Sequence, residues 1–398
     1  MPESTNLHSF SPSRSSQKTA KTTTSTSSRH LLFFTLILPI TLASILFRLD
    51  PFQPAHFPAE VMSRSIITAP ASNDKMRGGS KAMAEGHVEG PEDLVYDAAT
   101  GFIYTGCSDG WIKRVMVKES AAGDSGVESL VRTEGRPLGV ALDRNGDLVV
   151  ADSDKGLVKV TIREGKIELL TDEVEGLKFK LTDGVDIAED GTIYFTDASY
   201  KYSFNDFMFD ILEGKPYGRL ISYDPATNLT SLLVSNLYFA NGVAVSPDQQ
   251  FVIFCETILR RCRKYYIKGP KKGSIEKFVE NMPGYPDNIH YDGEGLYWIA
   301  LSSSPTYSWQ LALRYPIIRK AVARIVKYVG KPDMEKNGGA VSVDLEGNLK
   351  AHYYDAHFSL ISSAIKIGNH LYCGSLHYPF IIRLDLNKYP ALPTAAAA

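Results

Sequence analysis

Acidic and amide side chains recur at one position of a pattern that the chain repeats. Each copy begins with a small or acidic residue, continues with alternating apolar positions, turns at Asp, Gly or Asn, and ends with a second apolar run. Carboxylate and amide oxygens are the ligands that Ca²⁺ takes in proteins. Oxygen donors therefore dominate a position that holds, in chain order, Glu92, Leu138, Asp183, Asn241, Asp287 and Ser363.

The repeated unit predicts the fold. Two short alternating runs around a Gly- or Asp-containing turn are typical of a β-hairpin. A strand-only repeat of about 40–50 residues is typical of a β-propeller with four strands per blade. The sequence therefore predicts an all-β fold, a six-bladed propeller with four-stranded blades and short helical insertions. Its ring must close, since no single blade can bury both faces of its sheet.

The first strand of each unit is expected to line the central axis, so the residues before these strands should meet at the mouth of the channel. Clustered carboxylates would repel one another unless a positive charge lay among them. A set of oxygen donors without His or Cys favours Ca²⁺, with Mg²⁺ as an alternative, over zinc. The predicted metal ligands are Glu92, Asp183, Asn241, Asp287 and Asn288. Two other interpretations stay open: the acids are turn formers at strand starts, or a Lys or Arg pairs them.

A hydrolytic site at this ring would need a base to activate water. Asp183 is the candidate catalytic residue, being the additional acid of the ring. Asp152 and Glu256, which follow second strands, are weaker candidates. His290 and His377 also lie in repeated units, but a single His in a strand is more often a packing or surface residue.

Two long intervals between units hold insertions, residues Phe204–Gly218 and Ser308–Ile325. The second has helical periodicity that Pro316 should break. Both follow a second strand, so both can cover the same face as lids. The alternative is that they are peripheral additions without a role at the site.

The N-terminal part has a different composition. Residues 1–30 are rich in Ser and Thr and predict a disordered cytosolic tail. Residues 31–47 carry no charge and predict a transmembrane signal anchor, with a cleaved signal peptide as the alternative. The remaining ranges are a connector at 48–85, the propeller at 86–390 and a disordered tail at 391–398. This topology places the propeller in the lumen of the endomembrane system, in the endoplasmic reticulum or vacuole, or else outside the plasma membrane.

A lumenal body has further consequences. Asn228 lies in the sequon Asn-Leu-Thr and should be glycosylated. Cys255 and Cys262 flank a tight connection and can pair in an oxidising lumen, although two buried free thiols are an equal alternative. The 43 basic and 45 acidic residues nearly cancel, which argues against a general affinity for nucleic acid.

Four runs carry a resemblance to a known family: GPEDLVYD, LTDGVDIAEDGTIYFTDAS, FANGVAVSPD and PDNIHYD. From Gly90 to Leu386 the chain resembles the strictosidine synthase-like family of plants, which is similar to the animal adipocyte plasma membrane-associated protein. More distantly it is similar to calcium-dependent paraoxonases and gluconolactonases, which are six-bladed propellers. That resemblance implies metal binding by Glu92, Asn241 and Asp287. The third motif usually supplies an Asn, where this chain has Asp183.

Two departures from these relatives bear on function. Strictosidine synthase uses a Glu at the start of the last inner strand, where this chain has Ser362 or Ser363. A serine hydroxyl cannot replace the carboxylate as a general base at neutral pH. The paraoxonase His pair is replaced by Leu138 and Asp152. The expected function is metal-dependent hydrolysis of a small-molecule ester or lactone, and the protein itself is expected to be a membrane-anchored glycoprotein. The alternatives are a non-catalytic binding propeller with a structural metal and a divergent synthase acting on alkaloid-like substrates.

Overall fold

The computed structural model describes residues 30–62, 65–117, 126–331 and 336–393. The chain divides into two compact units, one ending at Phe52 and one beginning at Gln53. Most of the predicted tails, 1–30 and 391–398, lies outside the described residues.

The first unit contains one helix of 20 residues, His30–Leu49, which consists largely of η1 (Phe33–Ile37) and α2 (Leu38–Leu49). Its three hydroxyl side chains, Thr35, Thr41 and Ser44, donate to carbonyl oxygens four residues earlier, so they need no external partner. Among the described residues this is the one helix long and apolar enough to cross a membrane.

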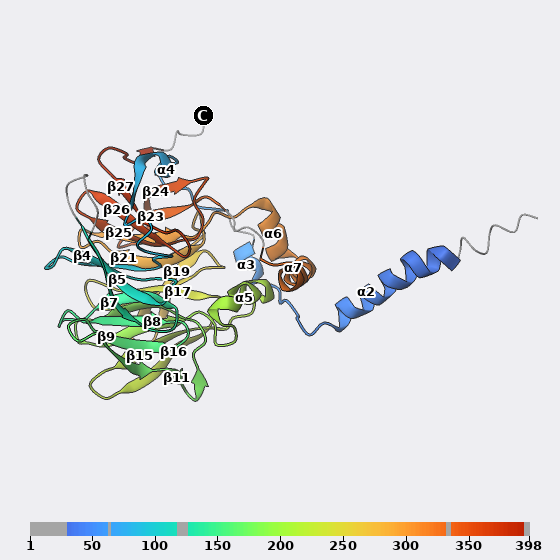
Figure 1. The fold of residues 1–398 in the computed structure, drawn as a ribbon, viewed down its shortest axis with the longest axis horizontal. Coiled ribbons are helices and arrows are strands. Elements are labelled where there is room, and N and C mark those ends of the chain that lie inside the picture. The colour runs from blue at the N-terminus through green and yellow to red at the C-terminus, as the bar shows by residue number, and fades with distance from the viewer. Residues whose placement is uncertain (1–29, 63–64, 118–125, 332–335, 394–398) are drawn as a thin grey trace, which may run out of the picture. The chain divides into compact units, whose positions relative to one another are not determined.

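The second unit is a six-bladed β-propeller (Figure 1), as predicted. Blade 1 contains β3 (Leu94–Asp97), β4 (Phe102–Gly106), β5 (Trp111–Met116) and β6 (Val127–Arg132). Blade 2 contains β7 (Pro137–Leu142), β8 (Leu148–Asp152), β9 (Gly156–Thr161) and β10 (Lys166–Thr171). Blade 3 contains β13 (Thr182–Ile187), β14 (Ile193–Asp197), β15 (Gly218–Asp224) and β16 (Leu229–Leu237).

The other three blades follow the same order from the axis outward. Blade 4 contains β17 (Ala240–Val245), β18 (Phe251–Glu256), β19 (Arg261–Tyr266) and β20 (Ile275–Val279). Blade 5 contains β21 (Pro286–Tyr291), β22 (Leu296–Leu301), β23 (Gly338–Asp344) and β24 (Leu349–Asp355), extended by β1 (Ala71–Asn73) and β28 (Leu392–Pro393). Blade 6 contains β25 (Ile361–Ile367), β26 (His370–Ser375), β27 (Ile381–Asp385) and β2 (Ser80–Met83). A short ribbon of β11 (Glu173–Val174) and β12 (Leu177–Lys178) follows blade 2.

The innermost hairpins close through turns that the sequence encodes locally. The Oδ1 of Asp143 accepts from the backbone N–H of Asn145 and Asp147, and Asp292 does the same for Glu294 and Leu296. Such Asx turns hold the chain reversal while the flanking apolar residues pack between blades.

The ring closes through a strand from the N-terminal side. Strand β2 pairs antiparallel with β27, from Ser80 opposite Leu384 to Met83 opposite Ile381. β1 pairs parallel with β24 and antiparallel with β28. Residues 48–85 were expected to be a connector, yet part of this segment completes blade 6 and extends blade 5. The strands of the propeller therefore begin well before residue 86.

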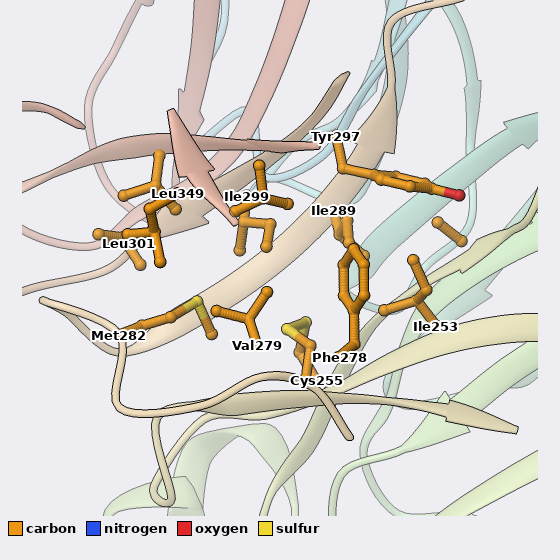
Figure 2. Close-up of a cluster of buried hydrophobic side chains, with 14 of the residues drawn as sticks. Ile253, Cys255, Phe278, Val279, Met282, Ile289, Tyr297, Ile299, Leu301 and Leu349 are labelled. Carbon is orange, nitrogen blue, oxygen red and sulfur yellow. A yellow bond between two sulfur atoms is a disulfide. The ribbon is translucent and has the colours of Figure 1, made fainter. Parts of the chain in front are cut away.

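Apolar side chains fill the space between neighbouring blades. Figure 2 shows the cluster between blades 4 and 5, where Phe278 meets Tyr297 edge to face with ring centroids 5.6 Å apart. A disulfide joins Cys255 and Cys262, which lie directly opposite each other on β18 and β19. The two sulfurs are therefore part of this buried cluster rather than of the channel.

The two insertions form helices at one end of the ring (Figure 1). The first contains η2 (Phe204–Asp206) and α5 (Phe207–Glu213). The second contains α6 (Tyr307–Arg314) and α7 (Pro316–Tyr328), which break at the predicted proline. Two shorter helices are α3 (Ala59–Met62) and α4 (Met76–Gly79).

Candidate metal centre at the channel mouth

Three carboxylates meet where the inner strands of blades 1, 3 and 5 begin. Glu92, Asp183 and Asp287 each place an oxygen within 4.8 Å of the others. All three are buried, with exposed fractions of 1, 4 and 5%. Asn241 and Asn288, the other two predicted ligands, are buried beside them.

Glycines allow the inner strands to bring these residues together. The residue after the ring position is Gly139, Gly184 and Gly242 in blades 2, 3 and 4. A Cβ at Gly184 would lie 2.8 Å from the carbonyl oxygen of Asn241, and one at Gly242 would lie 2.5 Å from that of Asp287. Only glycine permits such an approach of neighbouring strands.

Hydroxyl groups fix the backbone of the ring. Thr196 donates to the carbonyl oxygen of Asn241 at 2.6 Å, Thr257 to that of Pro286 at 2.8 Å, and Ser362 to that of Glu92 at 2.7 Å. Each bond crosses from one blade to the next. The ring residues are therefore held in place by blade contacts that are independent of their own side chains.

The side-chain oxygens are only partly satisfied. The Asn288 amide donates to Oε1 of Glu92 at 2.9 Å, whereas Oε2 of Glu92 and Oδ1 of Asn241 are buried without a hydrogen-bond partner. Buried oxygens without donors cost free energy unless a cation or water reaches them. These atoms lie where the predicted ligand atoms should be.

Burial and mutual repulsion both disfavour ionisation here. Burial raises the pKa of Glu92 well above its usual range, and the charges of Asp287 and Asp183 raise it further. The pKa of Asp183 is raised in the same way, by burial and then by Asp287. Burial raises the pKa of Asp287 to about 8, although a hydrogen bond from Asn241 lowers it. A cation among the three groups would reverse these shifts by stabilising the ionised forms.

The buried guanidinium of Arg136 forms no ion pair with the ring, although its charge opposes the rise in the pKa of Glu92 and of Asp183. Arg136 donates to the carbonyl oxygens of Pro137 and Gly90 at 3.2 Å. Among the described residues, no Lys or Arg forms an ion pair with Glu92, Asp183 or Asp287. The expectation that a basic side chain pairs these acids is therefore not met by this geometry, and the donor set fits a hard divalent cation.

An apolar cover closes the mouth above the ring. The cavity there has a volume of about 70 Å³. Its apolar lining comes from Phe204, Phe207 and Ile211 of the first insertion and from Leu138, Leu181, Phe239, Leu360 and Leu376, and its polar lining includes the ring residues Glu92, Asp183, Asn241 and Asp287. The first insertion is thus a lid over the ring. Sequence reasoning left open whether the insertions are lids or peripheral additions, and only the first lines this cavity. It missed the aromatic lining, which shows only as the phenylalanines of FNDFMF.

A second polar cluster forms around Asp93, the residue that follows Glu92 on the chain. Asp93 accepts from His290 Nε2 and from Ser363 Oγ, both at 2.7 Å. Asp93 also accepts from the backbone N–H of Val140 through its other oxygen. Sequence reasoning missed Asp93, although it directly follows Glu92. It also left His290 without a partner, because contacts across the channel leave no local pattern.

The weaker candidate bases have structural partners instead. Asp152 accepts from the backbone N–H of Arg136, Asp154 and Lys155. Glu256 accepts from the backbone N–H of Tyr238 and pairs with Arg261 at 2.6 Å. Neither lines the cavity. His377 also lies outside the cavity, with its ring tilted against that of Tyr378 at a centroid distance of 4.1 Å.

The predicted glycosylation residue lies far from this chemistry. Asn228 is exposed in the turn between β15 and β16, where Tyr223 donates to its Oδ1 at 2.8 Å. The turn is accessible, so Asn228 remains a candidate for modification.

Solved structures share the fold. A gluconolactonase from Xanthomonas campestris matches with a TM-score of 0.55 and 15% identity, over 81% of this chain and 99% of its own. The calcium-binding protein regucalcin from Agrobacterium tumefaciens matches with a TM-score of 0.54 and 14% identity, over 83% and 98%.

Sequence comparison is more specific. Family models match residues 183–270 as strictosidine synthase, 71–115 as strictosidine synthase-like, N-terminal, and 135–160 as NHL repeat. Protein STRICTOSIDINE SYNTHASE-LIKE 6 of Arabidopsis thaliana is 50% identical over 92% of this chain and 97% of its own length. Adipocyte plasma membrane-associated protein of Gallus gallus is 31% identical over 88% of both chains. The chain therefore belongs to the strictosidine synthase-like family.

Proposed function

We propose that the protein is a Ca²⁺-dependent hydrolase of small-molecule esters or lactones, anchored to an endomembrane by its N-terminal helix with the propeller in the lumen. The observation that carries the proposal is the buried set of Glu92, Asp183 and Asp287, in which Oε2 of Glu92 lacks a donor and, among the described residues, no Lys or Arg forms an ion pair with the three carboxylates. The fold shared with a gluconolactonase and a calcium-binding protein supports it.

Glu92, Asp183, Asn241 and Asp287 would hold the ion, while Asn288 orients Glu92 through its amide. Bound Ca²⁺ supplies a Lewis acid that polarises a carbonyl and stabilises a developing oxyanion. Asp183 accepts the proton of the attacking water, the acyl–oxygen bond breaks, and the proton passes to the leaving alkoxide. The apolar lid excludes bulk water, which strengthens every charge interaction in the cavity.

Synthesis of strictosidine is disfavoured by the last blade. Ser362 and Ser363 occupy the start of its inner strand, and both hydroxyls are committed, to the carbonyl oxygen of Glu92 and to Asp93. No carboxylate side chain is available at that position to serve as the base of an amine–aldehyde condensation. A divergent synthase would need another base, and Asp183 is the candidate.

A non-catalytic propeller with a structural metal is the second candidate function. It is favoured by the small cavity of about 70 Å³, which admits little more than a few waters until the lid moves. Calcium-dependent stability without turnover on esters or lactones would select it.

The test is hydrolysis of a panel of aryl esters and lactones by the chain from Gln53 onward, with calcium and with chelator, alongside thermal unfolding. The fragment must include β2, because blade 6 is incomplete without it. We expect calcium-dependent turnover that Asn241→Ala abolishes. Glu256→Gln is the matched control, a buried acid outside the cavity, and should keep its calcium response. Turnover that is insensitive to chelator would contradict the proposal.

A further inference from the structure

Helix α7 has partly inverted polarity: it buries Ala323 and Val326 in the usual way, but it also buries two cations and exposes two isoleucines. Arg319 is fully buried and Lys320 is 7% exposed, whereas Ile317 and Ile325 are 67 and 53% exposed. On a helix, Ile317, Ala321, Ile325 and Tyr328 share one face, since they are spaced by four, four and three residues. A helix that packs on a soluble protein in water shows the opposite arrangement.

The buried arginine explains why the helix lies this way round. Arg319 donates to the carbonyl oxygens of Leu212 and Glu213 at the end of α5 and of Ala312 in α6. The last carbonyls of a helix lack partners within it, and a buried cation satisfies them. Arg319 thereby fixes the orientation of α7, which leaves the apolar stripe facing outward.

The surroundings of the stripe have the composition of a membrane interface. Tyr307, Tyr315 and Tyr328 are exposed by 78, 47 and 69%, and tyrosines favour the headgroup region of a bilayer. Every charged residue from Tyr307 to Tyr328 is basic, and of these Arg314 and Lys327 are exposed, whereas Arg319 and Lys320 are buried. An exposed apolar face flanked by cations is typical of a helix that lies in the plane of an anionic membrane surface.

A cavity beside α6 extends this cationic character. Its volume is about 460 Å³, and Arg260 and Arg314 are the charged residues of its lining, together with apolar Ile66, Ile258 and Leu311. Arg260 uses Nη1 to donate to the carbonyl oxygen of Met282. The combination suits a phospholipid, with its phosphate at the arginines and its chain along the apolar wall.

Chain connectivity brings a bilayer within reach. Ala55 is fixed to α7, because its carbonyl oxygen accepts from Arg319 and its N–H donates to Glu213 at 2.8 Å. Five residues, 50–54, lie between Ala55 and Leu49, the last residue of the apolar helix, so the two Cα atoms can be separated by about 20 Å at most. If that helix spans a membrane, α7 is tethered close to the same membrane.

We infer that the exposed face of α6 and α7, defined by Tyr307, Tyr315, Ile317, Ile325 and Tyr328, docks on the surface of the bilayer in which the N-terminal helix is anchored. Because α5 lies directly behind α7 and carries the lid residues Phe207 and Ile211, this docking would hold the cover of the channel at the membrane. The inference depends on the helix being a membrane span and is independent of any hydrolytic activity.

The test uses the full chain in vesicles of phosphatidylcholine, with and without phosphatidylserine. An environment-sensitive fluorophore is attached at Ile325→Cys or, as a second site on the stripe, at Tyr328→Cys. Leu169→Cys is the matched control, because Leu169 on β10 is 54% exposed but stands outside the stripe. We expect nitroxide lipids to quench the two stripe labels several-fold more than the control, and phosphatidylserine to increase the difference.

Three results would overturn the inference. Stripe labels that aqueous iodide quenches as strongly as the control label would show that the face stays in water. Labels that are shielded from iodide yet not quenched by nitroxide lipid would show that a protein, or a second copy of this chain, covers the face. Lipid quenching that is equal at stripe and control sites would show adsorption without orientation.

Discussion

Two sets of buried acids, one at the starts of inner strands and one at the ends of second strands, differ in their partners. The channel acids are Glu92, Asp183 and Asp287, which begin the inner strands. The strand-end acids are Asp152, Asp197 and Glu256, which end the second strands of blades 2, 3 and 4 and have exposed fractions of 0%. Arg219 donates twice to Asp197, at 3.0 and 2.6 Å, and Arg261 pairs with Glu256.

This difference distinguishes acids that stabilise the fold from acids that could bind a ligand. Each strand-end acid accepts from backbone N–H groups of the loop that precedes the inner strand, as Asp197 does from Leu181 at 3.0 Å. The pKa alone does not separate the sets, because burial raises the pKa of Asp197 even though Arg219 lowers it. Partner geometry separates them better: the strand-end acids Asp197 and Glu256 each pair with an arginine, whereas among the described residues no channel acid pairs with a Lys or Arg. Asp152 is intermediate, because its Oδ1 accepts from backbone N–H groups while its Oδ2 is buried without a partner.

Breaking a strand-end pair should give the largest effect. Arg219→Met leaves Asp197 buried without its cation, which should reduce the free energy of unfolding by about 3–5 kcal/mol. Urea denaturation measures this free energy, and we expect the same loss in calcium and in chelator. A loss below about 1 kcal/mol would show that the backbone donors alone stabilise Asp197.

Calcium should stabilise through the channel acids alone. At a free concentration one hundred times the dissociation constant, the gain in unfolding free energy is about 2.7 kcal/mol. Asp183→Asn should remove most of that gain. In chelator the same variant should be more stable than wild type at neutral pH, because the wild-type carboxyl must take up a proton on folding and an amide need not.

Thermal unfolding of both proteins in calcium and in chelator gives the comparison. Glu256→Gln serves as the control, with a general loss of stability but an undiminished calcium response. If Asp183→Asn destabilised the calcium-free protein, the channel acids would be structural in the same sense as the strand-end acids.

The pH dependence without calcium should have a definite sign. The folded pKa values of Glu92, Asp183 and Asp287 are raised, to about 8 for Asp287. The native state then binds more protons than the unfolded state, so stability is full below about pH 4 for these groups and falls as pH rises towards 8. Each titrating group contributes at most about 1.4 kcal/mol per pH unit.

Denaturation in chelator between pH 5 and 8.5 measures this slope. Calcium should flatten it, since the bound ion favours the ionised carboxylates. A stability that rises with pH across this window in chelator would contradict the assignment of protonated channel acids.

An exposed ion pair should contribute the least to the free energy of unfolding. Glu128 pairs with Arg114 at 2.6 Å but is 53% exposed. Glu128→Gln should change the unfolding free energy by about 0.2–1 kcal/mol, with no effect of calcium. A larger loss, measured by the same urea titration, would mean that burial is not what distinguishes the strand-end pairs.

The repeated hairpins were predictable because their signal is local. Alternation and Asx turns such as that at Asp143 predict each inner hairpin, and the hairpins fix which residues start the inner strands. The positions of Glu92, Asp183, Asn241 and Asp287 at one mouth follow from that register and from six-fold repetition.

What depends on distant partners could not be predicted. Strand β2 has the sequence SKAM and β1 the sequence ASN, and neither has the apolar–polar alternation that predicts a strand. The partners of both strands lie near the other end of the chain. The contact of His290 with Asp93 crosses the channel. The assignment of Asp152 and Glu256 as candidate bases treated every acid after a strand alike, because sequence does not reveal which acids find donors.

The closing strand also imposes an order of events during synthesis. Ser80 emerges from the ribosome about 300 residues before Leu384, its partner on β27, a delay of roughly 15–60 s at 5–20 residues per second. Throughout that interval β2 has no partner strand, and the partly synthesised propeller has an unpaired sheet edge at each end. Translation of the final blade, rather than any earlier one, is therefore the moment at which the ring becomes a cooperative unit.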